Sequence, residues 1–213
     1  MSYSVKELFL TLQGEGAQAG RVAVFCRFSG CNLWTGREAD RTRGKGGCSR
    51  WCDTDFVGTD GQGGGRFEDA SALITAAQEV WGARGGRALL VCTGGEPLLQ
   101  MDDEFVAAAH AAGFEIAIET NGTLPVPEGV DWVCVSPKAG AKIVVLSGQE
   151  LKLVVPQEGI DPSDFVDLEF EHHFLQAKDS VDKDRDLQST IGYCLSHPKW
   201  RLSVQSHKFI GIP

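Results

Sequence analysis

The sequence predicts an α/β fold, an incomplete TIM-like barrel of about six parallel strands with few helices. Short apolar runs typical of strands alternate along the chain with stretches whose apolar residues recur at helical spacing. This alternation favours parallel strands joined by crossover helices. A complete eight-stranded barrel typically needs ~250 residues, whereas this chain has 213, so we expect the barrel to stay open.

The predicted strands are short and apolar. The first (residues 21–28, R-V-A-V-F-C-R-F) is rich in β-branched and aromatic residues, and the second (87–92) is a continuous apolar run, as expected of a strand covered on both faces. Further strands are expected at 114–118, 132–135, 151–155, 172–175 and 201–204.

Three helices are predicted from apolar residues at helical spacing, at 68–83, 102–112 and 182–196. Asp69 or Ser71 is suited to cap the first helix, and Gly113 closes the second. Between the first strand and the first helix, residues 30–66 show no periodicity and are rich in glycine. A loop of this length in a compact domain is usually functional. The whole chain, 1–213, is expected to form one domain.

Composition narrows the classes of partner. Lys and Arg number 20 against 29 Asp and Glu, a net charge of −9, which argues against a nucleic-acid partner because phosphate binding requires clustered basic residues. The basic run 37–45 is interrupted by Glu38 and Asp40 and is expected to be a solvated loop. Neither a secretory segment nor an apolar stretch of about 18 residues is present, so no membrane association is expected. Seven cysteines, an odd number, favour a reducing, cytoplasmic location over a disulfide framework.

The informative motifs all follow predicted strands. G-C-N comes after the first strand, T-G-G-E-P after the second, E-T-N-G after the third and S-P-K after the fourth. The carboxyl ends of parallel strands meet at one edge of a sheet, where chemistry gathers. The four motifs are therefore expected to form one site.

The cysteines divide into two groups. Four lie in predicted strands or a helix and are expected to be small buried hydrophobic residues (Cys26, Cys92, Cys134 and Cys194). Cys31, Cys48 and Cys52 instead lie in the polar, glycine-rich loop. Three thiolates without a fourth partner suggest a metal centre with one open coordination position, and soft thiolates favour zinc, copper(I) or an iron–sulfur cluster. A zinc site would require a histidine ligand, and all five histidines lie far from the trio in sequence.

These motifs carry a resemblance. The cysteine trio with T-G-G-E-P is similar to the radical S-adenosylmethionine (SAM) superfamily. L-Q-G-E-G (12–16), F-C-R-F-S-G-C-N-L-W, C-D-T-D, I-E-T-N-G-T, V-S-P-K, F-L-Q and Q-S-H-K (205–208) sharpen the match. Together they resemble the 7-carboxy-7-deazaguanine synthase family over nearly the whole chain. The resemblance implies that Cys31, Cys48 and Cys52 hold a 4Fe–4S cluster. The superfamily usually spaces these cysteines C-x3-C-x2-C, whereas here 16 residues and then three separate them, so the cluster loop is expanded.

The resemblance also implies binding residues. Thr54 would offer a hydroxyl oxygen to Mg²⁺, a hard cation that takes few protein ligands. Gly94 and Gly95 would let the backbone approach SAM, and Glu119 would accept from its ribose. The remaining SAM residues implied are Ser136, Pro137, Lys138, Gln176, Ala177, Lys178 and Asp179.

The implied substrate is 6-carboxy-5,6,7,8-tetrahydropterin. Because Arg27 points to the opposite face of its strand from Cys26, an inward Arg27 would pair with the pterin carboxylate. The other implied substrate contacts are Leu12, Gln13, Gly14, Glu15, Thr93, His207 and the terminal Pro213, the last within a substrate-contacting tail at 205–213.

The expected reaction is radical ring contraction of this pterin, with loss of ammonia, to 7-carboxy-7-deazaguanine in queuosine biosynthesis. The resemblance further implies a homodimer and an electron donor such as flavodoxin. Three alternatives remain at this stage: an activating enzyme for a glycyl-radical protein, a non-catalytic zinc-binding module, and an NTP-binding domain. The last is weak, because G-Q-G-G-G does not lead from a strand into a helix with G-K-S/T.

Overall fold

A computed structural model describes residues 2–213 and contains one nine-stranded sheet with four α-helices. The strands are β1 (Tyr3–Leu12), β2 (Val22–Phe28), β3 (Gly65–Phe67), β4 (Ala88–Gly94), β5 (Phe114–Thr120), β6 (Trp132–Val135), β7 (Ser147–Val155), β8 (Glu169–Ala177) and β9 (Trp200–Ser203). The helices are α1 (Ala70–Trp81), α2 (Asp103–Ala111), α3 (Lys183–Ser196) and α4 (Ser206–Ile210). Within residues 2–213, no helix combines the length and apolarity needed to cross a membrane.

The sheet follows the order β3-β1-β2-β4-β5-β6-β7-β8-β9 and does not close on itself. From β2 to β9 every neighbouring pair is parallel, which gives seven parallel strands against the predicted six or so. The predicted incomplete barrel with few helices is therefore confirmed. At the other edge, β1 and β3 add two antiparallel pairings that the sequence pattern did not predict.

Strand β1 escaped prediction for a physical reason. Its pairing with β2 shifts register between Val5 and Glu7, the mark of a bulge. The bulge interrupts the simple alternation of buried and exposed residues, and Lys6 and Glu7 place adjacent charges inside the strand. The loop predicted at 30–66 is also more ordered than expected, because it contains two short 3₁₀ helices, Glu38–Arg43 and Gly47–Arg50, and ends in β3.

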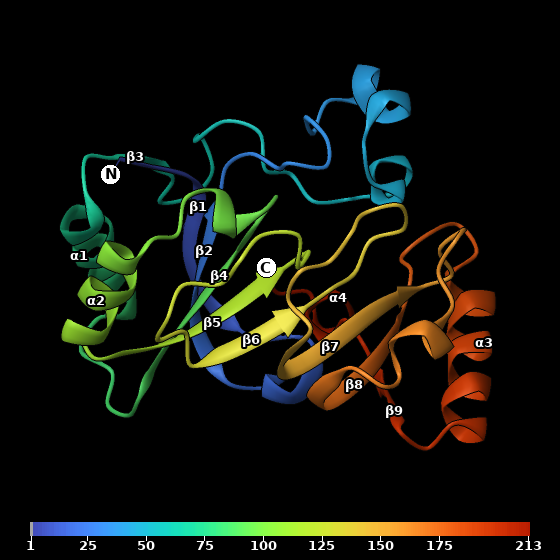
Figure 1. Ribbon diagram of the computed structural model, residues 1–213. Helices are drawn as coiled ribbons and strands as arrows, with labels where there is room; N and C mark the ends of the chain where they lie inside the picture. Colours follow the sequence, from blue (N-terminus) through green and yellow to red (C-terminus); the bar gives the residue numbers. More distant parts are fainter. Residues whose placement is uncertain (1) are drawn as a thin grey trace.

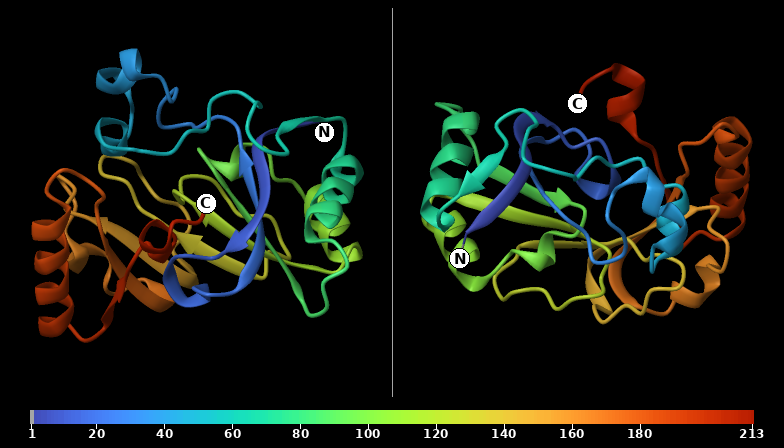
Figure 2. Two further views of the ribbon diagram at one scale, coloured as in Figure 1. Left: turned by 180° about the vertical axis from the view of Figure 1, so that it is seen from behind. Right: turned by 90° about the horizontal axis from the view of Figure 1, so that it is seen from above.

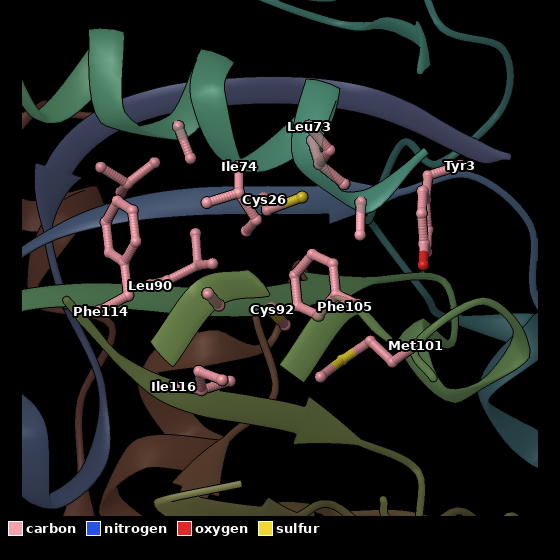
Figure 3. Close-up of a cluster of buried hydrophobic side chains, with 14 of the residues drawn as sticks. Tyr3, Cys26, Leu73, Ile74, Leu90, Cys92, Met101, Phe105, Phe114 and Ile116 are labelled. Atoms are coloured by element: carbon pink, nitrogen blue, oxygen red, sulfur yellow. The ribbon is translucent and has the colours of Figure 1, made fainter. Parts of the chain in front are cut away.

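Helices α1 and α2 cover the outer face of the sheet at one end and α3 covers it at the other, as Figure 1 shows. Helices α1 and α2 pack on the outward side chains of the first strands in one continuous apolar cluster, which includes Phe105, Cys26 and Cys92 (Figure 3). Helix α3 covers a second cluster on β7 and β8 around Leu151 and Leu153. Asp69 caps α1 as predicted, because its side chain accepts from the Ala72 N–H at 2.8 Å.

The inward side chains alternate with these core residues along each strand. On β5, Ile116 and Ile118 join the outer core, which turns Glu115 and Glu119 to the inside of the barrel. Figure 2 shows the C-terminal segment with α4 crossing this hollow side, opposite the three longer helices. The segment that carries the two 3₁₀ helices lies beyond the carboxyl ends of the strands (Figure 1). The fold therefore encloses a space between the strand ends, the expanded loop and the tail.

Candidate active site

Two adjoining cavities occupy this space at the carboxyl ends of the strands. We call them the cysteine compartment, whose wall includes Cys31, Cys48 and Cys52, and the tail compartment, whose wall includes His207 and Pro213. Six residues line both cavities and therefore form their junction: Glu15, Asp53, Thr54, Thr93, Glu119 and Gln205. All four motifs that were expected to meet at one site line the cysteine compartment.

The cysteine trio is brought together although 16 residues separate its first two members. Cys31 follows the end of β2, and its Sγ accepts from the Leu33 N–H at 3.4 Å. Cys48 lies in the second 3₁₀ helix, whose start is fixed by the Gly47 N–H donating to the Ala139 carbonyl at 2.7 Å. The Cys52 N–H donates to the Cys48 carbonyl at 2.7 Å, which closes the turn. The structure thus places Cys48, the member with the least distinctive sequence context, beside the other two.

Arg41 holds the expanded loop in this shape. Its guanidinium donates to the carbonyls of Ser49 and Cys52 at 2.8 and 3.2 Å, and it pairs with Glu38 at 2.5 Å. It also lies 4.8 Å above the ring of Trp34, a cation–π contact. The basic run was expected to be solvated, and most of it is exposed. Arg41 departs from that expectation because the loop carbonyls around the cysteines need donors.

The thiols are buried enough to affect their chemistry. Burial raises the pKa of Cys31, and it raises the pKa of Cys48 to about 11. Such thiols lose their protons when a metal takes them as thiolates. All three are free of disulfides. Within residues 2–213, no group of three or more His, Cys, Asp and Glu side chains is arranged to hold a single metal ion. In a 4Fe–4S cluster each thiolate would bind a different iron. The three thiols would therefore lie farther apart than the ligands of a single metal ion.

Glu96 of T-G-G-E-P is a residue whose role sequence reasoning missed. It is fully buried and accepts from the Thr120 hydroxyl at 2.7 Å, the Asn121 N–H at 2.8 Å and the Leu98 N–H at 3.1 Å. These bonds fasten the end of β4 to the end of β5. An acidic residue inside an otherwise apolar and glycine-rich motif was the signal, since a buried carboxylate needs such donors.

Close backbone packing requires glycine at positions 94 and 95, and the sequence alone did not predict this packing. A Cβ at Gly94 would lie 2.3 Å from the Phe28 carbonyl oxygen, and one at Gly95 would lie 2.1 Å from the Gly30 oxygen. Neither position tolerates a side chain, because the end of β4 packs directly against the chain leading to Cys31. Both glycines line the cysteine compartment, so close packing and cavity access coincide here.

Most residues predicted to bind SAM share one wall. Ser136 and Lys138 follow β6, and residues 176–179 end β8 and continue beyond it; all of them line the cysteine compartment. Pro137 is an exception, because it is buried and does not line the cavity; its carbonyl accepts from the Gln157 amide at 3.4 Å. Its contribution is to hold the turn between Ser136 and Lys138.

All eight residues predicted to bind the substrate line the tail compartment. Arg27 points inward as predicted, while Cys26 joins the outer core. The Arg27 guanidinium is paired through Nε with Glu7 at 2.7 Å, a partner the sequence did not suggest because β1 was not predicted. Arg27 lines this compartment together with Gln13 and Pro213.

The C-terminal segment is fastened across this compartment. Ser206 donates to the Gly14 carbonyl from its N–H at 3.0 Å and its hydroxyl at 2.8 Å. His207 packs so closely on Gly14 that a Cβ there would lie 2.3 Å from the imidazole Nδ1. Lys208 pairs with Asp53 at 2.8 Å and with Asp179 at 2.7 Å. The tail is thereby linked to both walls of the cysteine compartment.

Lys152 is the second site residue that sequence reasoning missed. It lies on β7, is 3% exposed, and pairs with Glu15 at 2.7 Å and Glu119 at 2.8 Å. Its charge lowers the pKa of Glu15 to about 2 against the opposing effect of burial, whereas burial keeps the pKa of Glu119 raised. Residues 150–153, E-L-K-L, alternate between polar and apolar. This alternation was the signal that Glu150 and Lys152 face the barrel interior.

Comparison with known proteins identifies close relatives. The chain is 61% identical over 213 residues to the 7-carboxy-7-deazaguanine synthase of Caulobacter vibrioides and 60% identical over 213 residues to that of Bordetella pertussis, and both alignments cover 100% of each chain. Its fold is similar to the crystal structure of QueE from Escherichia coli, with a TM-score of 0.70 and 26% identity over 97% of this chain and 95% of that one. No protein-family model matches the chain.

Proposed function

This chain belongs to the 7-carboxy-7-deazaguanine synthase family, and from this premise we propose which of its residues bind the cofactors and which bind the substrate. The enzyme is a radical SAM lyase that converts 6-carboxy-5,6,7,8-tetrahydropterin to 7-carboxy-7-deazaguanine with loss of ammonia, a reaction of the queuosine pathway. In our proposal SAM and the cluster occupy the cysteine compartment, and the pterin occupies the tail compartment. The observation that carries this division is the junction, since six residues line both cavities.

The cysteine trio fits a 4Fe–4S cluster. Its three thiols are free and line one cavity, and three protein ligands match a cluster that keeps one iron for SAM. When bound and reduced, the cluster supplies the electron that cleaves SAM and generates a radical able to take a hydrogen atom from C6 of the pterin. The protein's part is to hold Cys31, Cys48 and Cys52 in place through the backbone bonds and Arg41 contacts described above, and to exclude water from the cavity.

The walls supply complementary groups for both ligands. Ser136, Lys138 and residues 176–179 would bind SAM, and Glu119 would accept from its ribose. In the tail compartment, the forked N–H groups of Arg27 suit the pterin carboxylate, while Gln13 and Glu15 suit the amide and amino edge of the pterin. Alternating donors and acceptors of this kind orient a flat heterocycle without using its reacting carbon atoms.

Thr54 is proposed to offer its hydroxyl to Mg²⁺. Its place at the junction supports this role, because a cation bound there would contact the pterin on one side while keeping several water ligands. Thr54→Val is expected to leave the iron content unchanged and to raise the Mg²⁺ concentration needed for half-maximal turnover by about tenfold, roughly one lost oxygen ligand. An unchanged Mg²⁺ requirement would remove Thr54 from the metal site.

Turnover of the reconstituted enzyme tests the proposed function. The anaerobically reconstituted protein is incubated with reductant, SAM, Mg²⁺ and the carboxypterin, and we expect 7-carboxy-7-deazaguanine and ammonia in equal amounts. Formation of 5′-deoxyadenosine without this product would instead place the chain in another radical SAM branch, such as the activating enzymes. A colourless protein that binds one zinc and does not cleave SAM would favour the zinc-module alternative.

The cluster assignment is tested at Cys48. Cys48→Ala is expected to lose most of the bound iron and all turnover, because a three-thiolate site loses a third of its protein ligands. Cys194→Ala is the matched control, since Cys194 is a half-buried thiol on α3, outside both compartments. Four irons retained per chain in Cys48→Ala would show that another residue is the second ligand.

The tail is tested by deletion of Ile212 and Pro213. The Pro213 carbonyl accepts from the Thr11 hydroxyl at 2.9 Å, and Pro213 lines the tail compartment, which supports a role for the tail in binding the pterin. We expect the pterin to bind at least tenfold more weakly, the effect of losing one charge-assisted bond of roughly 1.5–3 kcal/mol. Iron content and SAM affinity should stay the same. Unchanged pterin affinity would exclude the tail from the substrate site.

An acidic electron donor such as flavodoxin is proposed to dock on the outer side of the expanded loop. A groove there is lined by Arg41, Lys45, Arg50 and Lys178, close to Cys48, and this basic surface stands out on a chain of net charge −9. Arg50→Glu with Lys45→Glu should weaken flavodoxin-supported turnover several-fold and leave dithionite-supported turnover unchanged. Equal loss with both reductants would contradict docking at this groove.

A homodimer in the cytosol is also proposed. Exposed apolar residues at the β9 edge and on α4 support a second copy as partner, chiefly Leu202, Val204, Phe209 and Ile210. The seven free thiols support a reducing compartment. Sedimentation at micromolar concentration is expected to give twice the mass of the 213-residue chain, and a monomer at that concentration would contradict the dimer.

A further inference from the structure

Lys152 lies where the two compartments meet and is not explained by the binding roles assigned so far. Its ammonium is almost fully buried, and it contacts Glu15 and Glu119 at 2.7 and 2.8 Å. Both carboxylates line both cavities. A buried lysine of this kind requires compensation, yet the compensation here exceeds what one charge needs.

The carboxylates around Lys152 outnumber it. Glu150 follows the same inward face of β7 two residues earlier, is 2% exposed, and accepts from the Ala17 N–H at 3.0 Å. One buried and two partly buried carboxylates thus surround one ammonium. Such an excess of buried negative charge is unfavourable for folding alone, which suggests that the group serves the ligands that enter the cavities.

Glu15 and Glu119 differ in how fully their oxygens are used. Glu15 accepts from the Gln176 and Gln205 amides at 3.1 and 3.0 Å in addition to Lys152. Glu119 accepts from Lys152 and, at 3.4 Å, from the Gln13 amide. A carboxylate has about four acceptor sites, so Glu119 keeps more free acceptor capacity than Glu15. Both carboxylates line both cavities.

We propose that Lys152 is a positioning residue for both ligands, because its two ion pairs orient Glu15 for the pterin and Glu119 for SAM. The proposal rests on the proposed function for the identity of the two ligands. Neither ligand needs to contact Lys152, since the lysine acts through the two carboxylates. Its removal should therefore weaken two different ligands at once.

Removal of the ammonium should also change proton binding. Without it, burial and mutual repulsion raise the pKa of both carboxyls, and Lys152 is at present the main influence that lowers the pKa of Glu15. A protonated carboxyl has no charge and fewer acceptor sites than the carboxylate. A ligand that binds the ionised form more tightly therefore displaces the proton, and ligand binding becomes coupled to proton release. The charged and titratable groups that face Lys152 are Glu15 from the turn after β1, Glu119 from β5, Cys134 from β6, Glu150 from β7, Lys138 after β6 and His207 from α4.

The test is titration calorimetry on the reconstituted holoenzyme, with SAM and the carboxypterin titrated separately in two buffers of different ionisation enthalpy. Lys152→Met is expected to bind each ligand about tenfold or more weakly, the effect of losing a charge-assisted contact. It is also expected to release protons near neutral pH where the wild type releases none. Arg21→Met is the matched control, since it removes a half-buried cation that pairs with Glu115 away from both compartments.

The two carboxylates provide a second, independent measurement. Glu15→Gln should weaken the pterin alone and Glu119→Gln should weaken SAM alone, so the three variants give a pattern of one ligand, the other ligand, and both. The proposal is overturned if Lys152→Met affects one ligand or neither, or binds without proton release, or if either Glu→Gln variant weakens both ligands equally. A wild type that binds neither ligand would sink the proposed function instead.

Discussion

Strand β5 carries two glutamates on the same inward face, one buried (Glu115) and one partly buried (Glu119), and their surroundings differ. Glu115, near the start of the strand, receives both terminal nitrogens of Arg21 at 3.0 and 2.9 Å and also pairs with Arg87 at 3.2 Å. Glu119, near its end, shares a single lysine with Glu15. Two arginines pair with Glu115, whereas Glu119 shares its one lysine with a second carboxylate.

The pKa values follow this difference. The Arg21 guanidinium lowers the pKa of Glu115, while burial raises the pKa of Glu119. A fully paired carboxylate contributes to stability, and an underpaired one at a cavity wall is typical of a functional site. We infer that the barrel interior around Glu115, near the start of β5, stabilises the fold. The interior around Glu119, at the carboxyl end of β5, is arranged for ligands.

The largest expected effect is on catalysis. Glu119→Gln should reduce turnover at least about 100-fold, because it removes a charged acceptor from the junction. Its free energy of unfolding should be equal to or above that of the wild type, since the substitution removes a buried carboxylate whose ionised form is disfavoured. Turnover and denaturant unfolding of the same preparation measure both effects. A large loss of stability would show that Glu119 belongs to the fold instead.

The next effect is on stability. Glu115→Gln should lower the free energy of unfolding by about 1–2 kcal/mol, because one charged hydrogen-bond acceptor is lost and its arginine partners can reach solvent. Turnover at a temperature where the variant is folded should stay within about twofold of the wild type. Urea unfolding followed by circular dichroism gives the first value. A turnover loss comparable to that of Glu119→Gln would erase the distinction between the two ends.

The pH dependence separates the same two residues. Because the folded-state pKa of Glu115 is lowered from 4.5, its contribution is present above pH 4.5 and is lost as the pH falls through the folded-state value. The stability gap between wild type and Glu115→Gln should therefore close toward acid. The folded-state pKa of Glu119 is raised from 4.5, so its contribution is lost as the pH rises, and Glu119→Gln should show no such closing gap. Urea midpoints between pH 7 and pH 3 measure both trends.

The smallest effect is expected at the surface clasp, the pair of salt bridges that Lys208 makes with Asp53 and Asp179. Lys208→Met breaks pairs with Asp53 and Asp179 that are partly exposed, and such pairs contribute little individually. Pterin affinity should fall about two- to fivefold, because the tail remains held by Ser206 and Pro213. Lys208→Arg should restore most of it. A loss as large as that of the tail deletion would mean that the clasp, and not the tail itself, forms the substrate wall.

The sequence predicted those parts of the molecule in which local pattern and final structure agree. The parallel strands, three helices and the placement of G-C-N, T-G-G-E-P and S-P-K at strand ends follow from apolar runs and their punctuation. Strand β1 did not follow, because its bulge breaks the period of two. Arg41 resembled a solvated charge, since nothing local shows that the folded loop presents carbonyls to it.

The site shows the same limit in its buried charges. The residues predicted from motifs lie together on the two cavity walls, with Pro137 as the exception. Lys152 was missed because the strand was predicted from its apolar half, Leu151 to Val155, and its partners come from β5 and the turn after β1. The only local sign of such long-range pairing is the alternation of polar and apolar residues. Alternation predicts which face of the strand a residue lies on, but it does not predict which distant residues pair with it.

A double-mutant cycle at positions 115 and 119 tests the separation of the two ends most directly. Four residues along a strand place the two side chains about 13 Å apart, and independent sites at that distance have additive effects. The account predicts that Glu115→Gln/Glu119→Gln combines the stability of the first variant with the turnover of the second, within about 0.5 kcal/mol. A coupling above about 1 kcal/mol in either stability or activation free energy would contradict it, because the two ends would then form one network.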